Sequence, residues 1–193
     1  MSSKFSLPTE MVELPSKGLL YPEDSPLAKG VVEMKYMTAK EEDILTNQNY
    51  INQGIVIDKL LQSLLVDKSI KYNDLLIGDK NAIMIAARIL SYGSTYPVYY
   101  MGETVEVDLS KIENKPIDKD FEKAQKNEFN FTLPVSKNKI TFRILTAGDE
   151  TSIENEIKGL KKLDQNVSPE VTTRLKYTIT SVSDSKQIGD IRD

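Results

Sequence analysis

Apolar side chains recur every three or four residues between positions 38 and 92, a period typical of helices packed on a core. The first helix begins with the capping box Thr38-Ala39-Lys40-Glu41, where hydroxyl and carboxylate each accept a hydrogen bond from the other residue's backbone amide. Asp79 is placed to cap the last helix, and Gly93 follows its end as a C′ glycine. The pattern predicts helices over 38–47, about 54–66 and about 80–92.

Alternation of apolar and polar residues replaces this period after Tyr96 and predicts strands. Paired runs flank Gly102-Glu103 and Lys137-Asn138, so we expect two antiparallel hairpins. The expected strands are Val98–Met101 with Thr104–Leu109, Phe129–Val135 with Lys139–Leu145, and an earlier one at Val31–Met37. The intervening segment 110–128 carries five Lys and five acids, and we expect a solvated loop or short surface helix that connects the hairpins.

The last part of the chain reads mainly as helix. One helix is expected near 149–163, and Pro169 is placed at the start of another. In the second, Val171, Leu175, Ile179 and Val182 repeat at helical spacing, although the Thr content suggests a strand; we favour helix. Ile188 and Ile191 look like the first turn of one more, so the helical pattern is interrupted at Asp193.

Together these elements predict an α+β fold: a helical block with small antiparallel β-hairpins and a helical C-terminal region. The expected segments are an extended N-terminal arm with a short strand (1–37), a helical block (38–93), antiparallel hairpins around the charged connector 110–128 (94–147), and a helical C-terminal region (148–193).

Two segments are candidates for partner binding. The arm is punctuated by four prolines yet carries more apolar side chain than a solvated tail, so it either packs on its own domain or reaches a partner. In the second case a chain lacking residues 1–30 would keep its helical block folded. Tyrosines also gather where the third helix meets the first hairpin, forming either a half-buried hairpin face or an interface. The candidate residues are Leu14, Pro15, Gly18, Leu19, Leu20, Tyr21, Tyr92, Tyr96, Tyr99 and Tyr100.

Composition removes many enzyme classes. The 193 residues include no His, no Cys and no Trp, which excludes an imidazole base, a thiolate nucleophile, a disulfide frame and a zinc ribbon. A net charge of -4 without a basic run argues against nucleic-acid binding. No apolar stretch approaches a membrane span and the N-terminus has no secretory h-region, so we expect no membrane partner and synthesis in the cytosol.

Motifs for catalysis or cofactors are missing or explained otherwise. No dinucleotide fingerprint, P-loop or calcium loop occurs, and we expect no cofactor and no metal. The S-x-x-K matches at Ser136 and Ser183 lie in a hairpin turn and a polar loop, which favours chance. The acids alternate with Lys on surfaces, so a carboxylate pair is a minor alternative. Arg88 is either a surface side chain or a buried ion pair with Asp79 or Glu41.

Four blocks in order resemble a known family. They are Glu13–Tyr21 (ELPSKGLLY), Met37–Leu45 (MTAKEEDIL), Gly78-Asp79 with Ala87–Gly93 (ARILSYG), and Phe131–Pro134 (FTLP). These blocks are similar to segments of the baseplate hub assembly proteins of T4-type bacteriophages, and together they span about 13–150. The C-terminal region fits more loosely.

The resemblance implies a protein that acts in phage baseplate or tail assembly by binding other baseplate hub or tail proteins. It also implies a zinc-stabilised tip, because similar proteins often carry a cysteine pair near the first hairpin. Here that region reads Val98–Glu103 (VYYMGE), so aromatic packing would have to hold the hairpin instead.

We therefore expect a non-enzymatic assembly or structural protein, in the host cytoplasm during assembly and in the virion baseplate if it stays there; an oligomer is possible. The alternatives are a peptidoglycan-cleaving tail enzyme that uses two carboxylates, and a nucleic-acid binder.

Overall fold

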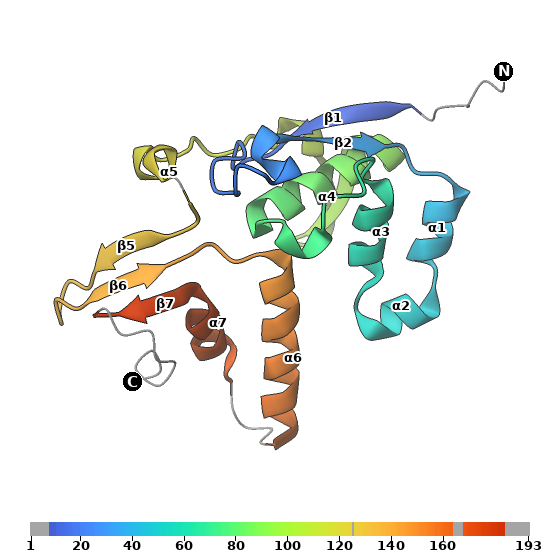
Figure 1. Cartoon of the computed structure of the whole chain (residues 1–193). Helices are drawn as coiled ribbons and strands as arrows, with labels where there is room; N and C mark the ends of the chain where they lie inside the picture. The colour runs from blue at the N-terminus through green and yellow to red at the C-terminus, as the bar shows by residue number, and fades with distance from the viewer. Residues whose placement is uncertain (1–7, 125, 164–167, 184–193) are drawn as a thin grey trace.

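A computed structural model of the chain describes residues 8–124, 126–163 and 168–183. It is α+β, as the sequence predicts, with small antiparallel sheets and helices of up to 17 residues. In Figure 1 the sheet β5–β6–β7 and α7 lie on one side of α6, and α1–α3 lie on the other. The expected helix start at Ile188 and Ile191 falls outside the described residues.

The first sheet pairs β1 with β2, and residues 14–30 of the arm connect the two strands. The strands are β1 (Thr9–Glu13) and β2 (Val31–Lys35), antiparallel, with Val12 opposite Val32. The sequence pattern predicts only the second of these strands. Between them the chain folds back and makes one 3-10 turn, Pro26–Lys29, before Gly30. The Leu14 amide then donates to the Gly30 carbonyl at 2.8 Å, which closes the loop.

Two glycines make this return possible. Gly18 and Gly30 both have positive φ, +78° and +71°. A Cβ on Gly18 would lie 2.4 Å from the carbonyl oxygen of Ala28, and one on Gly30 would lie 2.6 Å from that of Lys17. Conformation and space therefore both require glycine at these positions.

The helical block follows the prediction with two differences. Its helices are α1 (Ala39–Leu45), α2 (Gln48–Gln53), α3 (Val56–Leu64) and α4 (Ile77–Tyr92), with a 3-10 turn at Tyr72–Asp74. The capping box at Thr38 is present. The sequence pattern does not predict α2, and α4 begins before Asp79, with Leu76 at its N-cap. The prediction that Asp79 caps α4 is therefore wrong. Its carboxylate instead accepts hydrogen bonds from the arm.

The remaining elements form the two predicted hairpins (β3–β4 and β5–β6), the connector between them and the C-terminal region. They are β3 (Thr95–Tyr100), β4 (Glu103–Asp108), a 3-10 turn (Leu109–Lys111), α5 (Lys119–Lys123), β5 (Phe129–Thr132), β6 (Lys139–Phe142), α6 (Ala147–Leu163), α7 (Glu170–Thr178) and β7 (Ile179–Val182). The connector carries the short surface helix α5. The ring centroid of its Phe121 lies 4.5 Å from that of Phe129 in β5.

The prediction of helix through Val182 is wrong beyond Thr178. There the chain turns into β7, which pairs antiparallel with β6, with Ser181 opposite Thr141. The β-branched residues of this segment suit a strand, and pairing with a sheet formed 40 residues earlier decides between the two structures. Pro169 is the N-cap of α7 and not its first helical residue.

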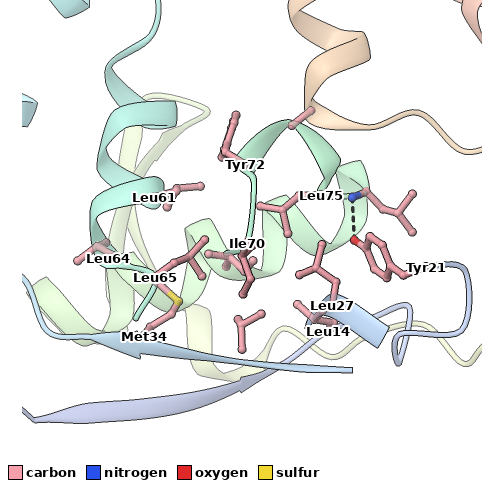
Figure 2. Packing of buried hydrophobic residues seen from close by; sticks show 14 of the residues in the cluster. Leu14, Tyr21, Leu27, Met34, Leu61, Leu64, Leu65, Ile70, Tyr72 and Leu75 are labelled. Carbon is pink, nitrogen blue, oxygen red and sulfur yellow. Dashed lines mark hydrogen bonds between the residues drawn. The ribbon is translucent and has the colours of Figure 1, made fainter. Parts of the chain in front are cut away.

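The core joins the arm to the helical block. Figure 2 shows Leu14, Tyr21 and Leu27 of the arm beside side chains of α3, α4 and the segment between them. Leu14 and Leu27 are at most 2% exposed. The buried side chains of the arm therefore pack on the chain's own domain, the first of the two interpretations. A chain without residues 1–30 would lose part of its core, so its helical block should not stay folded.

A buried carboxylate fixes the arm. Asp79, 1% exposed in the first turn of α4, accepts hydrogen bonds from the Ser16 amide (2.9 Å), the Ser16 hydroxyl (2.7 Å) and the Tyr21 hydroxyl (2.7 Å). The Tyr21 oxygen in turn accepts from the Leu76 amide at 2.8 Å (Figure 2). Burial, then the adjacent Asp79 carboxylate, raise the pKa of Tyr21, which keeps its hydroxyl a donor. We call Ser16, Tyr21 and Asp79 the arm latch.

A second buried carboxylate, Glu41, ties α1 to β2 and α3. It accepts hydrogen bonds from the Lys35 ammonium (2.6 Å), the Thr38 hydroxyl (2.5 Å) and the Ser63 hydroxyl (2.7 Å). Burial alone would raise its pKa, but these bonds outweigh burial and lower the pKa to about 2. The capping box therefore joins three elements and does more than start a helix.

Acid should weaken this junction. The folded pKa of Glu41, about 2, lies below the ordinary value of 4.5, so its contribution to stability is complete above pH 4.5 and is lost as pH falls toward 2. The difference between these pKa values corresponds to about 3 kcal/mol. We expect Glu41→Gln to be less stable than wild type at pH 6, and the gap to narrow by about that amount by pH 2. Urea unfolding across this range measures it.

Glu170 is the matched control for this experiment. Hydrogen bonds from Lys161, then Ser168, lower its pKa to about 2 as well, but its side chain is exposed. Solvent screens such a pair, so Glu170→Gln should change the acid response much less. A gap between wild type and Glu41→Gln that stays constant with pH would contradict the role assigned to Glu41.

Candidate functional site

The first hairpin displays apolar side chains that the fold does not cover. Strands β3 and β4 pair from Thr95↔Asp108 to Tyr100↔Glu103 around the two-residue turn Met101-Gly102. Both turn residues have positive φ, 50° and 90°, the conformation of a type I′ turn. Because side chains alternate along a strand, one face of the hairpin gathers five apolar residues. The apolar face is defined by Tyr96, Val98, Tyr100, Val105 and Val107, all exposed, and Glu103, opposite Tyr100, ends it at the tip.

The tip of the hairpin is the most exposed part. Tyr99 is 76% exposed and Met101 85%. The resemblance to phage proteins implies a zinc site at this hairpin, and without the cysteine pair aromatic packing would have to replace it, yet the tip tyrosines lie in solvent. The hairpin sequence has no Cys or His, and the described part of the chain contains no group of three or more His, Cys, Asp or Glu that could hold a metal. A zinc ion therefore does not fit this hairpin.

Arg88 on α4 anchors the base of the hairpin. Its guanidinium donates to the carbonyls of Gly93 (2.9 Å) and Thr95 (3.3 Å). It also lies over two tyrosine rings, 5.1 Å from the centroid of Tyr92 and 5.5 Å from that of Tyr96. Of the two interpretations of Arg88, the ion pair with Asp79 or Glu41 is not formed, because those carboxylates bind other groups. Arg88 instead links the end of the helix to the start of the strand through hydrogen bonds and cation–π contacts.

A groove of about 440 Å³ opens beside these two rings. Apolar side chains of α1, α3 and α4 line it, among them Leu45, Ile57, Leu60, Met84 and Ile85, together with Arg88, Tyr92 and Tyr96. Tyr96 belongs both to this lining and to the apolar face, so groove and hairpin form one continuous surface. At the rim the Tyr92 hydroxyl donates to the Glu42 carboxylate at 2.7 Å. That hydrogen bond, and then burial, raise the pKa of Tyr92.

The predicted binding residues fall into two separate groups, the tyrosines at the first hairpin and the residues of the arm. Among the tyrosines, Tyr92 and Tyr96 line the groove, and Tyr99 and Tyr100 lie at the tip. In the arm, Leu14, Leu20 and Tyr21 are buried in the chain's own core and Gly18 is buried in the return loop, so these four offer no surface to a partner. Pro15 and the partly exposed Leu19 line a second cavity of about 280 Å³, between the arm, α4 and the connector.

Sequence reasoning missed part of this surface. Val105 and Val107 alternate with acids, a pattern typical of an amphipathic strand, and that signal could have added them to the tyrosines. Ile57 and Met84 meet in the groove only because α3 packs against α4. No local pattern shows that contact.

Five described carboxyl groups have pKa values shifted away from what a general acid needs. The described carboxyl groups whose pKa departs clearly from its ordinary value are all lowered, because hydrogen bonds from nearby hydroxyl, amide or cationic groups outweigh any effect of burial. These groups are Glu41, Asp67, Asp108, Asp149 and Glu170. A glycosidase general acid needs the opposite shift, so these five are unsuited to that role.

Comparison with known proteins adds no relative. No family model matches the chain, and neither a curated protein nor a solved structure matches it. Within the described ranges, no helix is both long and apolar enough to cross a membrane.

Proposed function

We propose that this chain is a non-enzymatic interaction protein of a contractile-tailed bacteriophage, either an assembly factor for the baseplate hub or a structural part of it. The observation that carries the proposal is the continuous surface of the apolar hairpin face and the groove, with two tyrosines and a methionine at the tip. The resemblance of four ordered sequence blocks to baseplate hub assembly proteins supports the phage context.

Physical chemistry favours binding at this surface. Contiguous exposed apolar groups are rare on proteins that act alone, and they commonly mark sites of association. Tyrosine is enriched at interface hot spots because it buries much apolar area and keeps a polar tip. An isolated two-stranded hairpin is also only marginally stable in water, so a partner that packs on it would stabilise both.

The peptidoglycan-cleaving alternative has less support. In the described part of the chain the buried carboxylates are Asp79 and Glu41, which accept three and four hydrogen bonds from groups of the fold. A carboxylate whose oxygens are buried and already bound in this way cannot reach a substrate proton, as a general acid or base must. We therefore place the function in binding, in the host cytoplasm during assembly and in the virion baseplate if the protein remains there.

Affinity purification during infection tests this proposal. A tagged chain, produced in cells infected by the phage that encodes it, should retain baseplate hub or tail proteins, which mass spectrometry would identify against an untagged control. Recovery of tail proteins at the level of that control would contradict the proposal. Clear digestion of purified cell walls by the chain alone would instead support the enzyme.

A further inference from the structure

The two outer edges of the β3–β4 hairpin differ in the backbone hydrogen-bonding groups that they present. At the base of the hairpin the Leu109 amide donates to the Ser94 carbonyl at 2.9 Å. Hydrogen-bonded and non-hydrogen-bonded pairs alternate along an antiparallel ladder, so the pair Pro97↔Glu106 is non-hydrogen-bonded. The backbone of Pro97 therefore faces the outer edge of β3, and its missing N–H interrupts that edge in the middle.

The outer edge of β4 has no such interruption. By the same alternation the amides of Thr104 and Glu106 point away from β3. The described residues place no third strand in this sheet, and the side chains of both residues are exposed. A free edge with a full set of donors and acceptors is the usual template for strand addition.

We propose that the edge of β4 accepts an extended segment of a partner protein in which apolar residues alternate with Lys or Arg. This inference rests on the proposed function, since it names the kind of segment that the same hairpin binds. A strand added there would lay every second side chain beside Val105 and Val107 of the apolar face. The intervening side chains would lie beside Glu106 on the other face, where cations are favoured.

Charge selects this partner over a second copy of the chain. Residues 94–110 contain three acids, Glu103, Glu106 and Asp108, and no basic residue. The Lys111 ammonium lies 3.8 Å from the Asp108 carboxylate at the base of the hairpin. The Arg88 guanidinium is bound by backbone carbonyls and tyrosine rings. Two copies paired through β4 would bring acids against acids, which is unfavourable across neighbouring strands.

Selection from a random decapeptide library against the immobilised full chain tests the inference without any phage protein. We expect enriched peptides that alternate apolar and basic residues. In the complex with one such synthetic peptide, hydrogen exchange at the Thr104 and Glu106 amides should slow at least tenfold, whereas the Tyr99 amide on the β3 edge should not slow. Thr104→Pro should weaken peptide binding at least tenfold, and Thr104→Val, which keeps the amide, should not.

Several results would overturn the inference. They are no enrichment, enrichment of acidic or non-alternating peptides, protection of Tyr99 alone, or protection of β4 amides by self-association without peptide. If Thr104→Pro unfolds the hairpin, the protection pattern of the wild-type chain still decides. Success here together with failed recovery of tail proteins would reject the phage function and keep the strand-binding edge.

Discussion

Replacing Asp79 by Ala should lower the free energy of unfolding by about 3 to 5 kcal/mol, because three donors in or near the core lose a charged acceptor at once; this is the largest loss we expect from a single polar side chain in this protein. The substitution leaves the Ser16 amide and the hydroxyls of Ser16 and Tyr21 without their acceptor. Tyr21 is 7% exposed, so its hydroxyl cannot turn to water without moving the ring out of the core. The arm should then detach from α4.

Urea unfolding followed by circular dichroism measures this loss, and hydrogen exchange locates it. The Leu14 amide, bound to the Gly30 carbonyl, should exchange faster in Asp79→Ala, whereas amides within α7 should not change. Asp43→Ala is the matched control, because Asp43 is a helical acid of the same block with an exposed side chain. A loss below about 1 kcal/mol for Asp79→Ala would show that the arm is held by apolar packing alone.

The arm latch also marks where sequence reasoning fails. Asp79 has the spacing of a helix cap, and local patterns offer no other role for it. Its true partners lie 58 and 63 positions earlier in the chain. Only the folded core brings them together. The prolines and leucines therefore identify the arm in the sequence, but nothing in the sequence identifies Asp79 as the residue that anchors it.

Periodicity predicts the elements that carry a strong apolar stripe. Helix α3 has one and was predicted, whereas α2 (Gln48–Gln53) buries no residue and gives no such signal. Its start at Asn47, whose side chain accepts from the Asn49 and Tyr50 amides, and its end at Gly54 are visible in the sequence only as capping residues. The strand β7 was missed for a different reason, because pairing with a distant strand determined it.

Composition points to part of the candidate site. The concentration of tyrosine between Tyr92 and Tyr100 indicates the segment in which the structure exposes apolar side chains. Their distribution between groove and tip depends on Arg88, which holds two of the rings at the base of the hairpin. A guanidinium that lies over rings and caps a helix gives no sequence signature that separates it from a surface arginine.

Replacing both Tyr99 and Tyr100 by Ser should weaken binding to a recovered tail protein at least 100-fold, or about 3 kcal/mol. These rings are 76% and 61% exposed, so the free chain loses little packing when they are removed, and its unfolding free energy should change by less than about 0.5 kcal/mol. Titration calorimetry with the purified partner gives the affinity, and urea unfolding gives the stability.

Val135→Ser with Val171→Ser is the control that separates a specific site from general stickiness. Both valines are exposed apolar residues, 93% and 69%, on the β5–β6 turn and on α7, away from the first hairpin. If apolar exposure alone drives association, both double variants should lose affinity to a similar degree. If the hairpin tip is the site, only the tyrosine variant should lose it. Equal affinity of the tyrosine variant and wild type would remove the hairpin from the binding surface and leave the groove at Tyr92 to account for it.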